Sequence, residues 1–269
     1  MNEALPKISI VTPSFNQGRF LEETILSLVS QQYPALEYII MDGGSTDNSV
    51  EIITRHAKHL AFWVSEKDNG FGDAINKGFS KATGEIFCWL NSDDLLLPGA
   101  LLTIGKYFMK YKTVGLVFGN RHVIDINSSL LFKRNYFFYF PGQFRYGKTL
   151  PQESTFWRRS VFVEAGPVDE NLTYAIDFDL WCRISKIAII RHIPFYIGAF
   201  RKQPLSKSAI HRKIGIQERD QTIIKYFKKK PASLEQKLFQ FLLGLSRTLY
   251  RYLGFSALKQ AIISGKLYK

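Results

Sequence analysis

The sequence has few cysteines, no long apolar run and very few acidic residues in its last quarter. Only two of its 269 residues are cysteine, and both Cys88 and Cys182 lie inside apolar or helical patterns without metal-ligand spacing. We therefore expect two reduced core thiols, as is usual in a cytoplasmic protein. No apolar run approaches the roughly 20 residues that span a bilayer, and residues 1–7 lack the apolar core expected of a signal peptide.

The scarcity of acidic residues is confined to the C-terminal end. The chain holds 36 Lys and Arg against 23 Asp and Glu, a net charge of +13. Residues 1–200 contain 20 of each sign, so the other 16 basic and 3 acidic residues lie in 201–269. This asymmetry predicts a tail with an anionic partner, either a membrane surface or a nucleic acid, or else a merely solvated helical face.

Two further patterns are missing. No period of 20–50 residues repeats, which excludes solenoid folds. The first predicted strand is not followed by G-x-G-x-x-G, which weighs against a dinucleotide dehydrogenase. The sequence instead alternates apolar, β-branched runs with helical periodicity, which predicts an α/β fold with a mostly parallel sheet flanked by helices.

The predicted elements are regular in the first half of the chain and less so in the second. Strands are expected in the first half at 8–12, 37–41, 61–65 and 85–90. Helices are expected at 19–31, after 47, at 73–82 and at 99–111. Shorter strands are expected later at 114–119, 122–125, 152–157, 187–190 and 195–200. Residues 128–150 are aromatic and basic without a clean period, which suggests a loop over the site or an exposed face.

The strand at 85–90 ends in four consecutive small polar residues, Asn91, Ser92, Asp93 and Asp94. In open α/β sheets, ligands bind outside the carboxyl ends of the strands. Mg²⁺ takes oxygen ligands and is commonly held by one or two carboxylates together with substrate phosphates. The stretch therefore predicts a site for a divalent cation and a phosphate ligand, or a solvated turn.

Five short motifs in this order resemble a family-2 glycosyltransferase of the GT-A fold. They are Thr-Pro-Ser-Phe-Asn at 12–16, Asp-Gly-Gly-Ser-Thr-Asp at 42–47, the stretch 68–78, Asn-Ser-Asp at 91–93, and Asp-Phe-Asp-Leu-Trp with Arg at 177–183. Each motif is weak alone, but the shared order and spacing over about residues 7–200 make the resemblance specific. It implies an enzyme of bacterial polysaccharide biosynthesis that transfers a sugar from a nucleotide-diphosphate donor, using a divalent metal and inverting the anomeric carbon.

The resemblance also implies which residues bind the donor. These are Thr12, Pro13, Phe15, Asp42, Gly43, Asp68, Asn91 and Ser92. The metal, Mg²⁺ or Mn²⁺, is expected on Asp93, where it would act as a Lewis acid and template for both phosphates. Asp94 is a second candidate ligand. Asn91 departs from the family's Asp-x-Asp pattern and removes one negative charge from the site.

A general base must take a proton from the acceptor hydroxyl, and a carboxylate within hydrogen-bond reach can do so. Asp177 and Asp179 both begin a predicted helix, whose dipole favours a negative charge. The resemblance implies that Asp177 is the base, with Asp179 as the alternative, whereas Ile176 stands where the family often has Glu. The residues expected to contact the acceptor are Gln152, Glu153 and Trp181, of which Trp181 is alternatively a core residue.

The last quarter of the chain carries an apolar stripe at helical spacing. Its members are Leu234, Leu238, Phe241, Leu242, Leu245, Leu249, Tyr252 and Leu253. Lys237, Arg247, Arg251 and Lys259 flank it. A basic amphipathic helix with aromatic residues is typical of one that lies on an anionic membrane. The alternative is a helix that packs on its own domain or on a dimer partner.

Together these patterns predict a GT-A domain at 1–205 and a basic amphipathic helical tail at 206–269. Within the domain, 1–97 would bind the nucleotide sugar and 98–205 the acceptor. We expect a cytoplasmic enzyme, peripheral on the inner face of the membrane, that uses a UDP-sugar and a glycan or lipid-linked acceptor and binds no nucleic acid. The alternatives are a nucleotidyltransferase and a catalytically impaired binding subunit, the latter favoured by Asn91 and Ile176.

Overall fold

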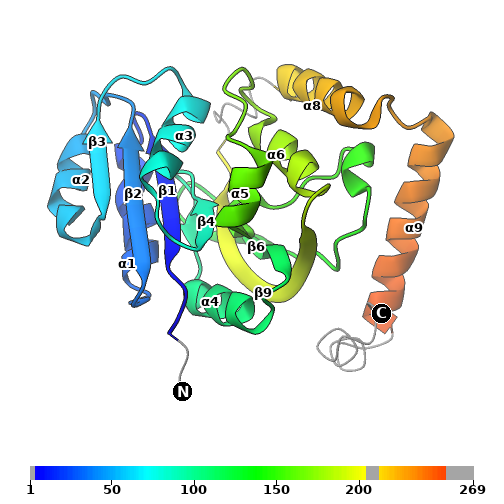
Figure 1. Cartoon of the computed structure of the whole chain (residues 1–269), viewed down its shortest axis with the longest axis horizontal. Coiled ribbons are helices and arrows are strands. Elements are labelled where there is room, and N and C mark those ends of the chain that lie inside the picture. The colour runs from blue at the N-terminus through cyan, green and yellow to red at the C-terminus, as the bar shows by residue number, and fades with distance from the viewer. Residues whose placement is uncertain (1–3, 204–211, 253–269) are drawn as a thin grey trace.

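The computed structural model describes residues 4–203 and 212–252, with side chains placed in the second range for 213–244. In the first half of the chain, four strands pair in parallel in the order β3-β2-β1-β4 (Figure 1). They are β1 (Ile8–Ser14), β2 (Leu36–Asp42), β3 (Phe62–Ser65) and β4 (Ile86–Trp89). Each coincides with one of the four strands predicted there, because those runs are apolar enough to be buried.

Helices cover both faces of this sheet because successive strand side chains point to opposite sides. Ile10 packs in the core beneath α1, α2 and α4, whereas its neighbour Val11 packs in the core beneath α3, α5 and α6. The helices are α1 (Gly18–Val29), α2 (Ser49–His56), α3 (Phe71–Lys81), α4 (Ala100–Lys110), α5 (Arg159–Ala165) and α6 (Ile176–Ile184). The predicted α/β class with a helix-flanked sheet is therefore confirmed. Cys88 and Cys182 are both free and buried, as expected.

The second half of the chain extends this sheet in a mixed arrangement, so the parallel pairing is less general than predicted. The full strand order is β3-β2-β1-β4-β8-β6-β9-β5, and β7 pairs with the last residues of β6, beyond those that pair with β8. The added strands are β5 (Leu95–Leu96), β6 (Val114–Ile124), β7 (Leu130–Arg134), β8 (Thr155–Arg158) and β9 (Ile189–Arg201). β8 runs antiparallel to both β4 and β6, whereas β6 and β9 are parallel.

Two long strands replace four predicted short ones. The runs 114–119 and 122–125 merge into β6, and 187–190 and 195–200 merge into β9. Register shifts interrupt the β6–β9 pairing at several points. Such bulges bend a strand and increase its twist, and β9 curls visibly around the sheet (Figure 1).

The aromatic segment 128–150 is partly ordered against the domain rather than a simple loop. It contains β7 and a short 3-10 helix, Gln143–Tyr146. Phe144 in that helix is fully buried and packs edge-on against Phe178 of α6, with ring centroids 5.9 Å apart. Just after this segment, another 3-10 helix, Gln152–Ser154, takes the place of the first half of the strand predicted at 152–157.

Three tryptophans form the centre of the core beneath α6. The ring of Trp181 stacks on that of Trp89 at 5.9 Å and meets Trp157 edge-on at 5.2 Å. Trp181 has 0% exposed surface. Of the two roles considered for Trp181, the structure therefore supports the core role, and its placement in the acceptor site is corrected.

Two helices follow the sheet, α8 (Arg212–Phe227) and α9 (Ser233–Tyr252). α8 packs on the domain, because Ile223 is buried in the same core as α6. α9 touches the domain mainly through Phe239, whose ring stacks on Tyr146 at 4.0 Å. The division of the chain at residue 205 stays a prediction, but α8 shares its core with residues before that point.

The exposed side of α9 carries part of the predicted apolar stripe. Leu234, Leu238, Phe241 and Leu242 are all exposed. The other members of the stripe and Arg247, Arg251 and Lys259 lie outside the side chains that the structure describes. Among the helices described, none combines the length and apolar character needed to cross a bilayer.

Candidate active site

The carboxyl ends of the four parallel strands meet along one edge of the sheet. Ser14, Asp42 and Ser65 are register partners at the ends of β1, β2 and β3, and the turn 91–94 follows β4. The strand order therefore brings together side chains predicted for the donor from four separate loops. This is the position at which an open α/β sheet binds its ligand.

Asp42 organises the turn that follows β2. Its carboxylate accepts hydrogen bonds from the backbone N–H of Ser45 at 2.8 Å, from the Ser45 hydroxyl at 2.6 Å and from the Ser65 hydroxyl at 2.7 Å. A carboxylate offers about four acceptor positions. The geometry thus leaves about one position for a ligand N–H, while the other three hold the turn in place.

The loop after β1 is fastened to the loop after β2 by reciprocal hydrogen bonds. The N–H of Asn16 donates to the Ser45 hydroxyl, and the Asn16 side-chain oxygen accepts from the N–H of Thr46, both at 2.8 Å. Asp47 accepts from the N–H of Gly18 at 2.9 Å. A Cβ on Gly18 would lie 1.8 Å from the Asn48 side-chain oxygen, so a larger residue would have to displace that side chain. The two loops form one preorganised wall of the site.

Among the residues predicted to line the donor base, only Phe15 presents its side chain to solvent, at 56% exposure. Thr12 is fully buried, and its hydroxyl oxygen accepts a hydrogen bond from Tyr38 at 3.1 Å. Pro13 is also buried within β1. The side chains of Thr12 and Pro13 therefore anchor the strand that ends at the site, and the place of these two residues in the donor site stays a prediction.

Gly43 and Asp68 come from different loops and lie against each other. A Cβ on Gly43 would sit 2.6 Å from a carboxylate oxygen of Asp68. Asp68 in turn accepts a hydrogen bond from the N–H of Gly70 at 2.9 Å, just before α3. Any side chain at position 43 would displace Asp68. These two predicted donor residues are therefore brought together by close packing.

In the turn after β4, the carboxylates of Asp93 and Asp94 have different hydrogen-bond partners. Asp94 is 1% exposed and accepts from the backbone N–H of Arg201 at 2.8 Å and from the Asn91 amide at 3.1 Å. Asp93 accepts a hydrogen bond from the amide of Gln203. Burial raises the pKa of Asp93, and burial with the neighbouring Asp93 charge raises the pKa of Asp94 well above its usual range. The Ser92 side chain is buried, and the Ser92 carbonyl accepts from the Thr24 hydroxyl at 2.9 Å.

Arg201, at the end of β9, supports this turn from beneath. Its guanidinium is 0% exposed and donates to the carbonyl of Asp93 at 2.7 Å and to the carboxylate of Glu23 at 2.6 Å. It also donates to the Ser128 hydroxyl at 2.8 Å and lies over the ring of Phe20 at 4.9 Å. Sequence reasoning missed this residue, because a basic residue after an apolar strand gives no sign of partners 70 to 180 positions away.

The side chains available as metal ligands suit a cation that is also coordinated by a substrate phosphate. In the described part of the chain, no three His, Cys, Asp or Glu side chains gather into a group that would bind a metal alone. Asp93 supplies one carboxylate, whose hydrogen-bond partner is a neutral amide. One carboxylate together with substrate phosphates is a common way of holding Mg²⁺. Asp94 fits less well as a second ligand, because its side chain is 1% exposed and its two oxygens already accept from Asn91 and Arg201.

The residues predicted for the acceptor lie beside the end of β4, and they differ in accessibility. Gln152 donates from its amide to the carbonyl of Trp89 at 2.7 Å. Glu153 is 1% exposed and bonds Arg121 at 3.4 Å and the Ser154 hydroxyl at 3.1 Å. A contact between Glu153 and an acceptor is therefore corrected to a buried structural role. The side-chain oxygens of Gln152 and Asn91 are buried and have no hydrogen-bond partner among the described residues.

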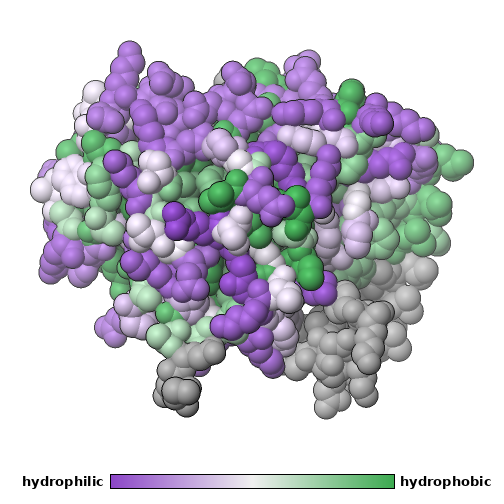
Figure 2. Space-filling view, viewed as in Figure 1, coloured by the Kyte–Doolittle hydropathy of each residue, from purple (hydrophilic) through white to green (hydrophobic). Residues whose placement is uncertain are grey.

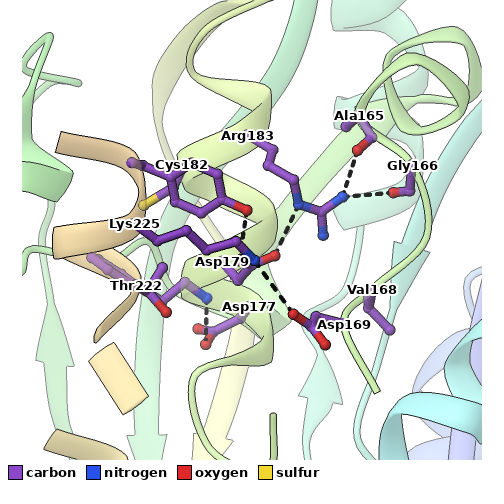
Figure 3. Close-up of polar contacts among 12 residues, drawn as sticks. Ala165, Gly166, Val168, Asp169, Asp177, Asp179, Cys182, Arg183, Thr222 and Lys225 are labelled. Atoms are coloured by element: carbon purple, nitrogen blue, oxygen red, sulfur yellow. Dashed lines mark hydrogen bonds and ion pairs between the residues drawn. The ribbon is translucent and has the colours of Figure 1, made fainter. Parts of the chain in front are cut away.

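The two carboxylates of α6 have unequal surroundings (Figure 3). Asp179 is buried and accepts from Arg183 at 2.8 Å and from the Tyr226 hydroxyl at 2.9 Å. Asp177 accepts from the N–H of Phe178 at 2.7 Å and makes a long 3.4 Å hydrogen bond with the Thr149 hydroxyl. Burial raises the pKa of Asp177 to about 6. A carboxylate of that pKa can accept a proton near neutral pH.

Comparison with known proteins gives a consistent result. The model of the family described as Glycosyl transferase family 2 matches residues 9–163. An uncharacterized glycosyltransferase of Nostoc sp. is 35% identical over 123 residues, which cover 45% of this chain and 37% of the relative. This chain therefore spans well under half of that relative's length.

Solved structures resemble the fold as well. S. aureus TarS 1–349 in complex with UDP-GlcNAc matches with a TM-score of 0.63 and 15% identity, over 82% of this chain and 71% of that one. The mannosyltransferase PcManGT from Pyrobaculum calidifontis, in complex with GDP-Man and Mn²⁺, matches with a TM-score of 0.63 and 19% identity, over 86% of this chain and 67% of that one. At these identities the likeness shows the fold alone.

The contacts of Arg201 generate a stability prediction. Replacing Arg201 by Leu should lower the free energy of unfolding by about 1–3 kcal/mol, the usual cost of leaving buried acceptors, here the Asp93 and Asp125 carbonyls, without a partner. Urea denaturation followed by circular dichroism measures this. Arg55→Leu is the matched control, because Arg55 makes exposed ion pairs with Glu22 and Glu51 and should cost less than about 1 kcal/mol. Equal effects of the two changes would contradict the supporting role of Arg201.

Proposed function

Because the chain belongs to glycosyl transferase family 2, we propose that it transfers a sugar from a nucleotide-diphosphate donor to a glycan or lipid-linked acceptor. The transfer would invert the anomeric carbon and serve cell-surface polysaccharide synthesis. Among nucleotide sugars, we propose a UDP-sugar as the donor. The observation that carries the proposal is the convergence of Asp42, Gly43, Asp68 and Asp93 on one sheet edge, together with a half-buried carboxylate of raised pKa on α6.

The donor would lie along the carboxyl ends of β1 to β4. Asp42 has about one free acceptor position for a base or ribose group, and Phe15 offers an exposed ring beside it. Mg²⁺ or Mn²⁺ on Asp93 would neutralise charge on the departing diphosphate.

Asp177 is proposed as the general base. Its carboxylate makes one short hydrogen bond, to a backbone N–H, so it retains acceptor capacity for the hydroxyl of an incoming acceptor. Asp179 is less suited to this role, because it is 1% exposed and its oxygens accept from Arg183 and Tyr226. Asp177 would take the hydroxyl proton as the acceptor oxygen attacks the anomeric carbon.

A binding assay tests the donor and metal proposals together. UDP-sugars should raise the thermal unfolding midpoint, and more so with Mn²⁺, since a ligand at 100 times its Kd stabilises by about 2.7 kcal/mol. Asp93→Asn should remove the Mn²⁺-dependent part and abolish transfer. Glu51→Gln, an exposed change of the same charge on α2, is the control. A Mn²⁺ effect that persists in Asp93→Asn, or transfer that a chelator does not diminish, would refute the metal assignment.

Kinetics test the base. Asp177→Asn should lower kcat by about 10²–10⁴-fold, the usual contribution of a general base, without changing donor affinity. The wild-type kcat should rise with pH through about 6 and level off above it, because the raised pKa keeps Asp177 protonated and inactive at lower pH. Asp179→Asn should instead lower stability, by loosening Arg183 and Tyr226. If folded Asp179→Asn loses kcat and Asp177→Asn does not, the two roles are reversed.

We also propose that α9 and the basic C-terminal residues hold the protein on the inner face of a membrane. Figure 2 shows apolar surface over α9 at the right edge of the molecule, with hydrophilic surface above it. The exposed apolar residues Leu234, Leu238, Phe241 and Leu242 belong to this helix, and the chain beyond residue 200 carries the whole net charge of +13. A basic amphipathic helix of this kind suits an anionic lipid surface.

Vesicle sedimentation tests the membrane role. The full chain should bind anionic vesicles, with each basic residue near the surface adding up to about 1 kcal/mol at low salt. Binding should weaken but persist in high salt, because burial of the apolar face is not screened. Leu238→Ser with Phe241→Ser should abolish the salt-resistant part, whereas Gln236→Ser with Gln240→Ser on the same helix should not. Equal binding by both double variants would contradict the role of the apolar face.

A further inference from the structure

A carboxylate from α8 lies at the start of the helix that carries Asp177. Glu218 accepts hydrogen bonds from three consecutive backbone N–H groups: Thr173 at 3.1 Å, Tyr174 at 2.7 Å and Ala175 at 2.9 Å. α6 begins at the next residue, and Ala175 has no side chain able to cap it. The cap is therefore supplied by a residue more than 40 positions later in the chain.

The approach of α8 to this turn is close. A Cβ on Gly215, one turn before Glu218, would lie 3.2 Å from the Cβ of Tyr174. Glycine at position 215 thus lets α8 approach the segment that Glu218 binds. Four residues after Glu218, the buried Thr222 donates its hydroxyl to the Glu218 carbonyl at 2.9 Å.

A second anchor from α8 holds the following turn of α6. Tyr226 donates to Asp179 at 2.9 Å, and Lys225 lies 3.5 Å from the same carboxylate (Figure 3). Arg183 joins Asp179 to the carbonyls of Ala165 and Gly166, at the end of α5. Asp179 is thus fixed from two sides, whereas Asp177 has one short hydrogen bond, to its own backbone, and the long contact with Thr149.

We propose that Glu218 is a positioning residue for the general base. The inference rests on the function proposed for Asp177. Glu218 fixes the backbone of 173–175, and Asp177 lies only two residues beyond, so the direction of its carboxylate depends on that turn. A displacement of about 1 Å in a reacting group can lower a rate by about 100-fold. The chain beyond residue 205 then contributes to catalysis through α8.

Steady-state kinetics of three variants test this. Glu218→Ala should lower kcat by about 10- to 100-fold while the donor KM stays within twofold, because the main contacts of α8 in the described part of the chain are with α6 and the 3-10 helix Gln143–Tyr146. Glu218→Gln should recover much of kcat, since its amide oxygen can still accept from Tyr174 and Ala175. Asp220→Asn is the matched control: it makes the same charge change two residues along α8, where Asp220 pairs with Lys230, and should behave as wild type.

A merely structural role predicts a different pattern. It would lower the thermal midpoint but leave kcat per folded molecule unchanged well below that midpoint. Values of kcat for Glu218→Ala within twofold of wild type would overturn the inference, as would equal losses in Asp220→Asn. A loss shared equally by kcat and donor affinity would also overturn it.

Backbone hydrogen exchange measures the contact without any substrate. The N–H groups of 173–175 should exchange slowly in wild type and in Asp220→Asn, and at least about tenfold faster in Glu218→Ala, because each tenfold corresponds to about 1.4 kcal/mol of lost protection. Unchanged exchange in Glu218→Ala would contradict the hydrogen bonds between Glu218 and residues 173–175. If exchange behaves as expected but the wild-type protein transfers no sugar, the proposed function fails, and with it the positioning role, while the contact stands.

Discussion

The carboxyl ends of β1 to β4, where the sugar donor is proposed to bind, are called the donor edge below. Their arrangement depends on the buried guanidinium of Arg201. An arginine stays charged at any physiological pH, so burying it requires acceptors on every side. β9 meets that requirement by ending between α1, the turn after β4 and the turn before β7, where Glu23, the Asp93 carbonyl and the Asp125 carbonyl each accept a hydrogen bond. The same residue's backbone N–H bonds Asp94. The position of Asp93 at the surface of the site is thus set by a strand that enters the fold a hundred residues later.

This dependence explains why β9 is long and curled. To deliver Arg201 beneath the 91–94 turn while also pairing with β6 from Val114 onward, the strand must change direction along its length. The register shifts in the β6–β9 pair provide the bend. The mixed half of the sheet is therefore not an appendage to the parallel half, because it carries the support of the donor edge and the wall on which α6 packs.

The parallel half of the fold could be predicted from the sequence because its signals are local. Apolar β-branched runs followed by Gly- and Asp-rich loops placed β1 to β4 and the loops that carry Asp42, Asp68 and Asp93. The long-range part could not be predicted in this way. From the sequence alone, Trp181 could be either an exposed platform for a sugar ring or a core residue. Its stacking on Trp89 depends on where α6 lies. Glu218 and Arg201 acquire their roles only from partners far away in the chain, which no periodicity records.

The charge asymmetry of the last quarter gives no indication that α8 and α9 pack differently on the domain. A block with 16 basic and 3 acidic residues favours one partner for the whole segment. α8 and α9 nevertheless differ, because α8 uses one of those few acidic residues, Glu218, to bind the domain. α9 contacts the domain through Phe239 and an ion pair between Glu235 and Arg145. Net charge describes the surface of the segment, whereas its packing is decided by individual side chains.

The two departures from the family pattern are both accommodated by the structure, which bears on whether the site is active. Asn91 donates to Asp94, and an aspartate there would place a third carboxylate beside two whose pKa values are already raised by burial. Its amide therefore relieves repulsion without removing Asp93. Ile176 is buried in the core beneath α6, so it fills space and leaves the adjacent Asp177 at the surface of the site. Both changes alter what surrounds the reacting carboxylates and leave those carboxylates in place, which favours a working transferase over an impaired binding subunit.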